Sequence, residues 1–125
     1  MTKVKLCSSS ILVDSGNGFR FKVTYNLEET SAFAIRINGQ VHSYLNRCSH
    51  LPVELDWNYA NFLDESGFNI VCATHGALYE AVSGQCLGGP CSGRPLIKLT
   101  LTEENGFVYW MPTDGMAIPE NGIED

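Results

Sequence analysis

Two cysteines and two histidines stand in two tight pairs along the chain. Cys48 and His50 form the run Cys-Ser-His. Cys72 and His75 form the run Cys-Ala-Thr-His, which begins 24 residues after Cys48. Thiolates and imidazoles are metal ligands, and ligands separated by one or two residues can reach the same centre from a single loop. The four side chains are therefore predicted to hold a metal centre.

Short strands are predicted to lead into both of these pairs. Gln40–Leu45 precedes the first pair and is expected to form a hairpin with Ala32–Ile37. The two residues between them, Asn38-Gly39, are the strongest two-residue hairpin turn that a sequence can offer. Phe68–Val71 is a short predicted strand that ends directly before the second pair. Each pair is thus expected to lie in a loop at the tip of a hairpin.

The rest of the chain shows the same alternation of short strands and turns. The other predicted strands are Phe19–Tyr25, Leu78–Ala81, Gln85–Leu87, Ile97–Leu101 and Phe107–Trp110. The last two are expected to form a hairpin whose turn spans residues 103–106. No window shows a long helical period, and residues 54–62 are expected to carry at most one short helical turn. The fold class is therefore all-β and antiparallel, a small barrel or sandwich. We expect a single domain over residues 1–113, followed by a polar tail over residues 114–125 that lies loosely on the surface.

Composition and charge narrow the function classes. The chain has 125 residues, 44% of them hydrophobic and 18% charged, which is ordinary for one folded domain. A net charge of −6 argues against nucleic acid and against an anionic membrane surface as partners. Neither a signal peptide nor an apolar run of membrane-spanning length is evident, so a cytoplasmic location is expected. A disulfide framework would be out of place there, which favours metal ligation by the cysteines.

The two pairs resemble the Rieske 2Fe–2S motif, in which two cysteines hold one iron and two histidines hold the other. Three further features extend the resemblance. Gly76 follows the second histidine, Tyr79 stands four residues after that histidine, and Gly88-Gly89-Pro90 is similar to the proline loop that covers the cluster. The resemblance spans roughly residues 30 to 110.

This resemblance implies a Rieske-type fold with a cluster-binding subdomain of two hairpin loops, and one 2Fe–2S cluster per chain. Cys48 and Cys72 would ligate the buried iron. His50 and His75 would ligate the outer iron. Gly76, Tyr79 and Pro90 would surround the cluster.

Departures from the high-potential respiratory members of the family are informative. Those proteins carry an extra cysteine in each loop, where this chain has Val53 and Thr74, so a disulfide between the loops cannot form. They also place a serine two residues after the second histidine, where this chain has Ala77. Losing that donor leaves a reduced cluster less stabilised. We therefore expect a potential in the lower part of the Rieske range of about −150 to +300 mV.

The pattern most resembles the Rieske ferredoxins that supply bacterial oxygenases. It implies a one-electron carrier between a reductase and an oxygenase, and not an enzyme. Only His42 remains beyond the four ligands, so this chain cannot build the two-histidine, one-carboxylate iron site of an oxygenase. Two alternatives stay open. One is an accessory small subunit of a larger reductase, similar to that of assimilatory nitrite reductases. The other is a structural or redox-sensing metal module, including a zinc site.

Three cysteines and one aromatic segment lie outside the motif. Cys7 is expected to act as a small buried hydrophobe. Cys86 and Cys91 flank the predicted proline loop; packing is favoured for them, with a redox-active pair as the alternative. The segment Leu51–Val71 is expected to pack its aromatic side chains on the β core, and the alternative is a flap for partner docking or cluster shielding. Its aromatic residues include Trp57, Tyr59 and Phe62.

Overall fold

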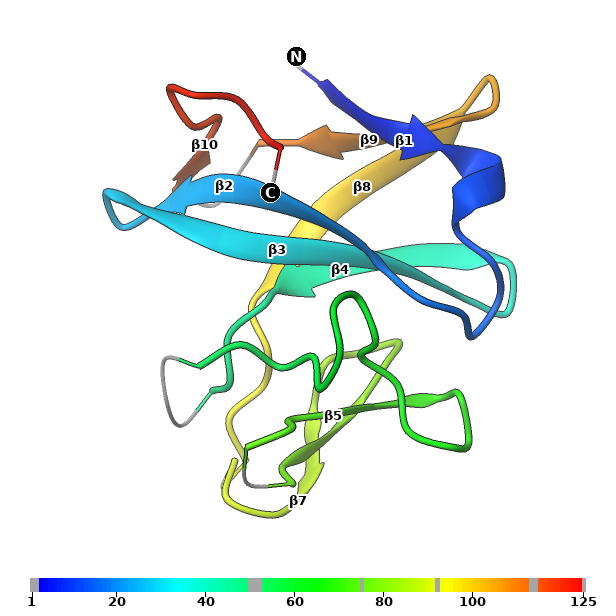
Figure 1. The fold of residues 1–125 in the computed structure, drawn as a ribbon, viewed down its shortest axis with the longest axis vertical. Helices are drawn as coiled ribbons and strands as arrows, with labels where there is room; N and C mark the ends of the chain where they lie inside the picture. Colours follow the sequence, from blue (N-terminus) through cyan, green and yellow to red (C-terminus); the bar gives the residue numbers. More distant parts are fainter. Residues whose placement is uncertain (1–2, 50–52, 75, 92, 113–114, 125) are drawn as a thin grey trace.

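Two antiparallel sheets make up the protein, and a computed structural model describes residues 3–49, 53–74, 76–91, 93–112 and 115–124. Figure 1 shows the larger sheet above and the smaller one below it. The larger sheet has the strand order β1-β9-β8-β4-β3-β2-β10, and the smaller has the order β5-β6-β7. The larger sheet contains β1 (Val4–Ser8), β2 (Phe19–Tyr25), β3 (Glu28–Ile37), β4 (Gln40–Leu45), β8 (Lys98–Glu104), β9 (Phe107–Met111) and β10 (Met116–Ala117). The smaller contains β5 (Asn69–Val71), β6 (Leu78–Glu80) and β7 (Cys86–Gly88).

The predicted all-β, antiparallel class is confirmed. A single turn of 3-10 helix over Ser9–Ile11 is the helix found in the described part of the chain. The turn at Asn38-Gly39 has both residues at positive φ, 49° and 81°, and it joins β3 to β4 with Ile37 opposite Gln40. These backbone angles match the right-handed twist of the flanking strands, which is why Asn-Gly is favoured there.

The hairpin between β8 and β9 closes more tightly than the sequence suggests. The predicted turn spans residues 103–106, whereas β8 continues to Glu104, which pairs with Phe107. Only Asn105 and Gly106 form the turn, at φ values of 53° and 83°. Cross-strand pairing therefore extends through two glutamates at this end of the large sheet.

Strand β3 lies between two hydrophobic cores. Ala32, Phe33, Ala34 and Ile35 are all fully buried, although successive side chains on a strand point to opposite faces. Ala32 and Ala34 join the core inside the curled large sheet. Phe33 and Ile35 join a second core, which lies between this sheet and the small one. A strand buried on both faces explains why this stretch is apolar without alternation.

The segment between the two cysteine–histidine pairs divides its aromatic residues between core and surface. Phe62 is buried and stacks on Phe33, with ring centroids 3.8 Å apart and an interplanar angle of 11°. Trp57 and Tyr59 stay 53% and 67% exposed. Packing on the β core is therefore confirmed for Phe62 and wrong for the other two. The described residues of the segment, 53–71, contain no helical turn.

The C-terminal segment does not lie loosely on the surface, so that expectation is wrong. Met116 and Ala117 form β10 and pair with Tyr25 and Thr24 of β2. Met116 is buried in the large-sheet core, and Ile123 packs against the same core. The backbone N–H of Lys22 donates to the Ile123 carbonyl at 2.8 Å. Met116 and Ile123 thus hold a largely polar segment in place. The predicted domain boundary between residues 113 and 114 lies outside the described residues.

Replacing Phe62 by Ala is expected to lower the free energy of unfolding by about 3–5 kcal/mol, because it empties a fully buried ring site between the two sheets. Urea denaturation followed by circular dichroism measures this change. Trp57→Ala is the matched control, and its half-exposed ring should cost far less. Equal losses in the two variants would contradict the assigned packing.

Candidate metal centre

The structure brings both cysteines of the two pairs into one buried cluster of side chains. Cys48 lies shortly after β4 of the large sheet, and Cys72 directly follows β5 of the small sheet. They are 3% and 0% exposed, and both belong to the core between the sheets. His50 and His75 lie outside the described residues. The site therefore depends on two chain segments that come from different sheets.

Backbone hydrogen bonds close the loop that follows each cysteine. The N–H of Cys48 donates to the Val53 carbonyl at 2.9 Å. In the second loop, the N–H of Cys72 donates to the Ala77 carbonyl at 2.8 Å. The N–H of Gly76 donates back to the Cys72 carbonyl at 2.9 Å, and Gly76 has a φ of +73°. Such closure holds the start and the end of each loop together.

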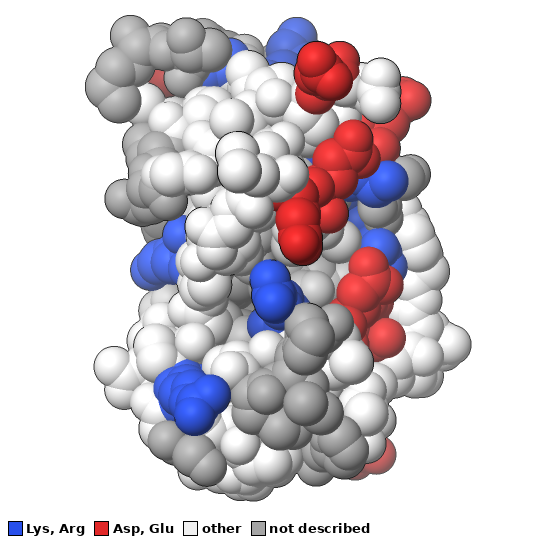
Figure 2. All heavy atoms as spheres, turned by 90° about the vertical axis from the view of Figure 1, so that its left-hand side faces the viewer, with Lys and Arg blue, Asp and Glu red and all other residues white. Residues whose placement is uncertain are grey.

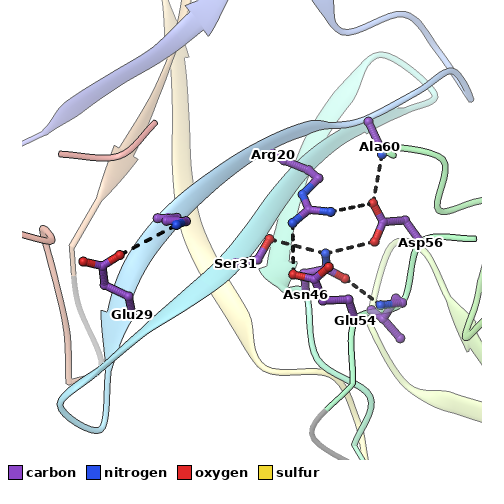
Figure 3. A network of polar contacts seen from close by, with 9 residues as sticks. Arg20, Glu29, Ser31, Asn46, Glu54, Asp56 and Ala60 are labelled. Carbon is purple, nitrogen blue, oxygen red and sulfur yellow. Dashed lines mark hydrogen bonds and ion pairs between the residues drawn. The ribbon is translucent and has the colours of Figure 1, made fainter. Parts of the chain in front are cut away.

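A polar network fixes the chain that returns from the first loop (Figure 3). The Arg20 guanidinium on β2 donates to Asp56 and to Glu54, each at 3.0 Å. Asn46 donates to the other Asp56 oxygen at 3.1 Å and accepts the N–H of Leu55 at 2.7 Å. The Asp56 side chain is only 2% exposed, so this charge requires its partners. The network ties the segment after the first loop to the large sheet.

Tyr79 on β6 reaches across from the small sheet to the first loop. Its hydroxyl lies 3.5 Å from Cys48 Sγ and 2.8 Å from Ser49 Oγ. The Ser49 N–H donates to the same oxygen at 3.1 Å. Burial, followed by the hydrogen bond with Cys48, raises the pKa of Tyr79, so its hydroxyl keeps its proton at neutral pH. With the amide donating to its oxygen, that proton is available to the sulfur or to the serine.

The Gly88–Pro90 loop packs against the second cysteine loop. Gly89 has a φ of +81°, and a Cβ there would lie 3.1 Å from Ala77 Cα and 3.2 Å from the Gly76 carbonyl oxygen. Any side chain at this position would push the two loops apart. Pro90 is half-buried beside it.

A disulfide joins Cys86 and Cys91 across this loop, with Cα atoms 5.9 Å apart. The pair packs on the core between the sheets, as expected, but it does so as a disulfide and not as two separate thiols. Strand β7 ends at Gly88, and the chain bends at Gly89 and turns at Pro90 and Cys91, so the two cysteine side chains meet. Cysteines five residues apart around a Gly-Gly-Pro turn were the available sequence clue. Cys91 is fully buried and Cys86 is half-buried.

The remaining cysteine and histidine do not join the site. Cys7 is buried in the large-sheet core, as expected, and burial raises the pKa of its thiol to about 11. His42 lies half-buried on β4 opposite Ile35. Burial, together with the charge of Lys98, lowers the pKa of His42. Both residues are thus neutral near pH 7.

The residues present fit an iron–sulfur group. The two buried cysteines, Cys48 and Cys72, belong to one core, and the Tyr79 hydroxyl contacts the Cys48 sulfur. Gly89 lets the Gly88–Pro90 loop, here called the covering loop, pack on the second cysteine loop. Cysteine sulfur is the ligand that such clusters use. Among the described residues no three cysteine, histidine or acidic side chains gather, and both predicted histidine ligands lie outside that part of the chain.

A model of the Rieske [2Fe-2S] domain family matches residues 2–107. The chain belongs to this family. The match confirms the resemblance drawn from the two pairs, and the cofactor of this Rieske protein is a 2Fe–2S cluster. The zinc alternative is therefore not retained.

Solved structures share the fold of this Rieske protein. The ferredoxin of carbazole 1,9a-dioxygenase from Nocardioides aromaticivorans IC177 has a TM-score of 0.70 at 18% identity, over 90% of this chain and 100% of that one. A Sphingomonas yanoikuyae B1 ferredoxin has 0.68 at 22%, with the same two coverages. The terminal oxygenase of carbazole 1,9a-dioxygenase from Novosphingobium sp. KA1 has 0.70 at 20%, over 90% of this chain and 30% of that one.

A search of curated protein sequences found no match. In the described part of the Rieske protein, no helix has the length and apolar character needed to cross a membrane.

Replacing Tyr79 by Phe removes the hydroxyl beside Cys48 Sγ. We expect the reduction potential to fall by about 40 mV, the one-electron equivalent of about 1 kcal/mol, because the sulfur gains negative charge on reduction. Protein-film voltammetry measures the shift. The control is Tyr44→Phe, which removes another buried hydroxyl, one that donates to the Ala81 carbonyl at 2.7 Å. An equal shift in the control would contradict a specific role for the Tyr79 hydroxyl.

Replacing both Cys86 and Cys91 by Ala should lower the free energy of unfolding by about 2 kcal/mol, the chain-entropy estimate for so short a loop. The visible absorption of the cluster should also bleach faster in air, because the covering loop is no longer held. Cys7→Ala is the control for losing a buried cysteine distant from the loops. If the Cys86/Cys91 variant keeps its colour as long as the wild type does, the disulfide does not hold the Gly88–Pro90 loop in place.

Proposed function

We propose that this Rieske protein is a one-electron carrier that passes electrons from a reductase to an oxygenase. The observation that carries the proposal is that Cys48 and Cys72 belong to one buried core, with the Tyr79 hydroxyl 3.5 Å from the Cys48 sulfur. Solved structures support the direction of transfer. One similar structure is a complex of reduced oxygenase and oxidized ferredoxin in carbazole 1,9a-dioxygenase, with a TM-score of 0.68 and 23% identity.

The proposed ligands are Cys48 and Cys72 for the inner iron, with His50 and His75 for the outer one. The bound cluster supplies a site that accepts and releases a single electron. Histidine ligands carry less negative charge than thiolates, so they raise the potential above that of an all-cysteine ferredoxin.

The surrounding residues hold the ligands and exclude water. The Tyr79 hydroxyl fixes the first loop through Ser49 and contacts the Cys48 sulfur. Gly89 allows the Gly88–Pro90 loop to pack on the second cysteine loop, and Gly76 adopts the positive φ of +73° within that second loop. The apolar core that contains both cysteines excludes water from the buried side of the site. These contacts hold in place the two loops that carry the proposed ligands.

Substrate oxygenation is not part of the proposal. The chain has three histidines, and with His50 and His75 assigned to the cluster only His42 is left. A mononuclear iron site of the oxygenase type uses two histidines and a carboxylate. Such a site would have to belong to the partner.

We place the carrier in the cytoplasm. The Cys86–Cys91 disulfide must then persist in a reducing compartment. Because Cys91 is fully buried, one of the two sulfurs of the disulfide is shielded from attacking thiols.

Exchanging either histidine ligand for cysteine tests the ligand assignment. His50→Cys and His75→Cys should each lower the reduction potential by roughly 100 mV or more, because a thiolate replaces a neutral imidazole. Voltammetry and EPR of the reduced protein follow the change. His42→Gln is the matched control and should leave both potential and spectrum as they are. Loss of the cluster spectrum in that control would overturn the assignment.

A further inference from the structure

A small hollow lies beside the first cysteine loop. It has a volume of about 200 Å³ and is lined by Arg47, Cys48, Ser49, Arg94, Pro95 and Ile97. The first loop forms one wall, and the segment that leads into β8 forms the other. None of the described residues of the second cysteine loop or of the Gly88–Pro90 loop lines it. The hollow therefore lies between the first loop and the segment that precedes β8.

Two arginines flank this hollow without a carboxylate partner in the described part of the chain. The other two arginines are both engaged, since Arg20 pairs with Glu54 and Asp56, and Arg36 pairs with Glu103. By contrast, Arg47 is half-buried and Arg94 is exposed, and neither forms an ion pair or hydrogen bond with a described side chain. Their positive charges are available for a ligand.

The charge around the hollow differs from that of the protein as a whole. The net charge is −6, and a neighbouring groove of about 220 Å³ is lined by Glu28, Glu29 and Glu54. Figure 2 shows acidic side chains running down this face of the molecule, with basic side chains below and beside them. Arg47 lines both the groove and the hollow. Among the described lining residues, the charged ones in the hollow are both arginines, whereas the groove beside it carries three glutamates.

We propose that this hollow is a docking point for an acidic patch on the protein redox partner, with a partner carboxylate held between Arg47 and Arg94. The inference rests on the proposed function. A guanidinium offers paired N–H donors that match the two oxygens of a carboxylate. Pro95 and Ile97, both exposed, give an apolar wall on which a protein surface can pack. Docking here brings the partner against the loop that carries Cys48.

Local and overall charge favour opposite partners, which makes the proposal testable. The acidic protein as a whole attracts a basic partner, whereas the arginine pair attracts an acidic one at the cluster end. An arginine-to-glutamine change at the hollow must therefore act selectively on acidic partners. The same change of charge far from the hollow must not.

The test uses two protein acceptors, basic cytochrome c and its fully succinylated, acidic derivative. One electron leaves the reduced holo-protein and converts ferric haem to ferrous haem, which stopped-flow absorbance records. R47Q/R94Q is compared with K3Q/K5Q, which has the same charge change on or beside β1, at the opposite end of the molecule (Figure 1). R94Q alone, at an exposed position, is a second variant that should fold normally.

At low ionic strength we expect R47Q/R94Q to transfer electrons to succinylated cytochrome c about five-fold more slowly than K3Q/K5Q does, with the difference shrinking as salt screens it. R94Q should show part of this loss. Transfer to native cytochrome c should not slow in any variant. Equal slowing in the two double variants, or slowing toward both acceptors, would overturn the docking point.

A binding measurement separates this proposal from the proposed function. The redox-inert anion hexacyanochromate(III) should broaden the NMR signals of residues 47 and 94–97 in the wild type, and not in R47Q/R94Q. Selective broadening without transfer to either cytochrome would contradict the carrier function and leave the anion site standing. Broadening together with unchanged transfer from R47Q/R94Q to succinylated cytochrome c would mean a site for small anions only, and would overturn protein docking.

Discussion

Docking of the small sheet against the large one is the constraint on which the site depends. Cys48 follows a strand of the large sheet and Cys72 follows a strand of the small sheet, so neither sheet alone can assemble the pair. The Phe33–Phe62 stack and the Tyr44 hydroxyl bond to the Ala81 carbonyl hold the sheets together. Tyr79 then bridges them at the sulfur itself. One apolar interface thus determines both the stability of the fold and the geometry of the centre.

Local chemistry made much of this fold predictable. Asn38-Gly39 specifies its turn through positive φ at both positions, and β4 has the predicted bounds, whereas β3 begins at Glu28, before the predicted start at Ala32. The cysteine–histidine spacing similarly indicated the metal centre, because ligand type and reach are properties of a few adjacent residues. Tyr79 and the Gly88–Pro90 loop were found through the family resemblance, and both lie against the cysteine loops.

What the sequence could not reveal depends on contacts between distant segments. Pairing of Met116–Ala117 with β2 needs the large-sheet core to accept Met116, which no local pattern shows. Trp57 and Phe62 are aromatic residues of the same short segment, yet Phe62 is buried and stacks on Phe33 whereas Trp57 is 53% exposed. The Cys86–Cys91 bond depends on how sharply the chain returns after β7. The hollow between Arg47 and Arg94 likewise joins residues 47 positions apart.

The central claim is that the two loops hold a 2Fe–2S cluster through two cysteines and two histidines. Pulsed EPR of the dithionite-reduced protein, with histidine selectively labelled with ¹⁵N, tests it most directly. We expect a rhombic signal from one unpaired electron, coupled strongly to two imidazole nitrogens. A cluster signal without strong nitrogen couplings, or a colourless protein that contains one zinc ion, would contradict it.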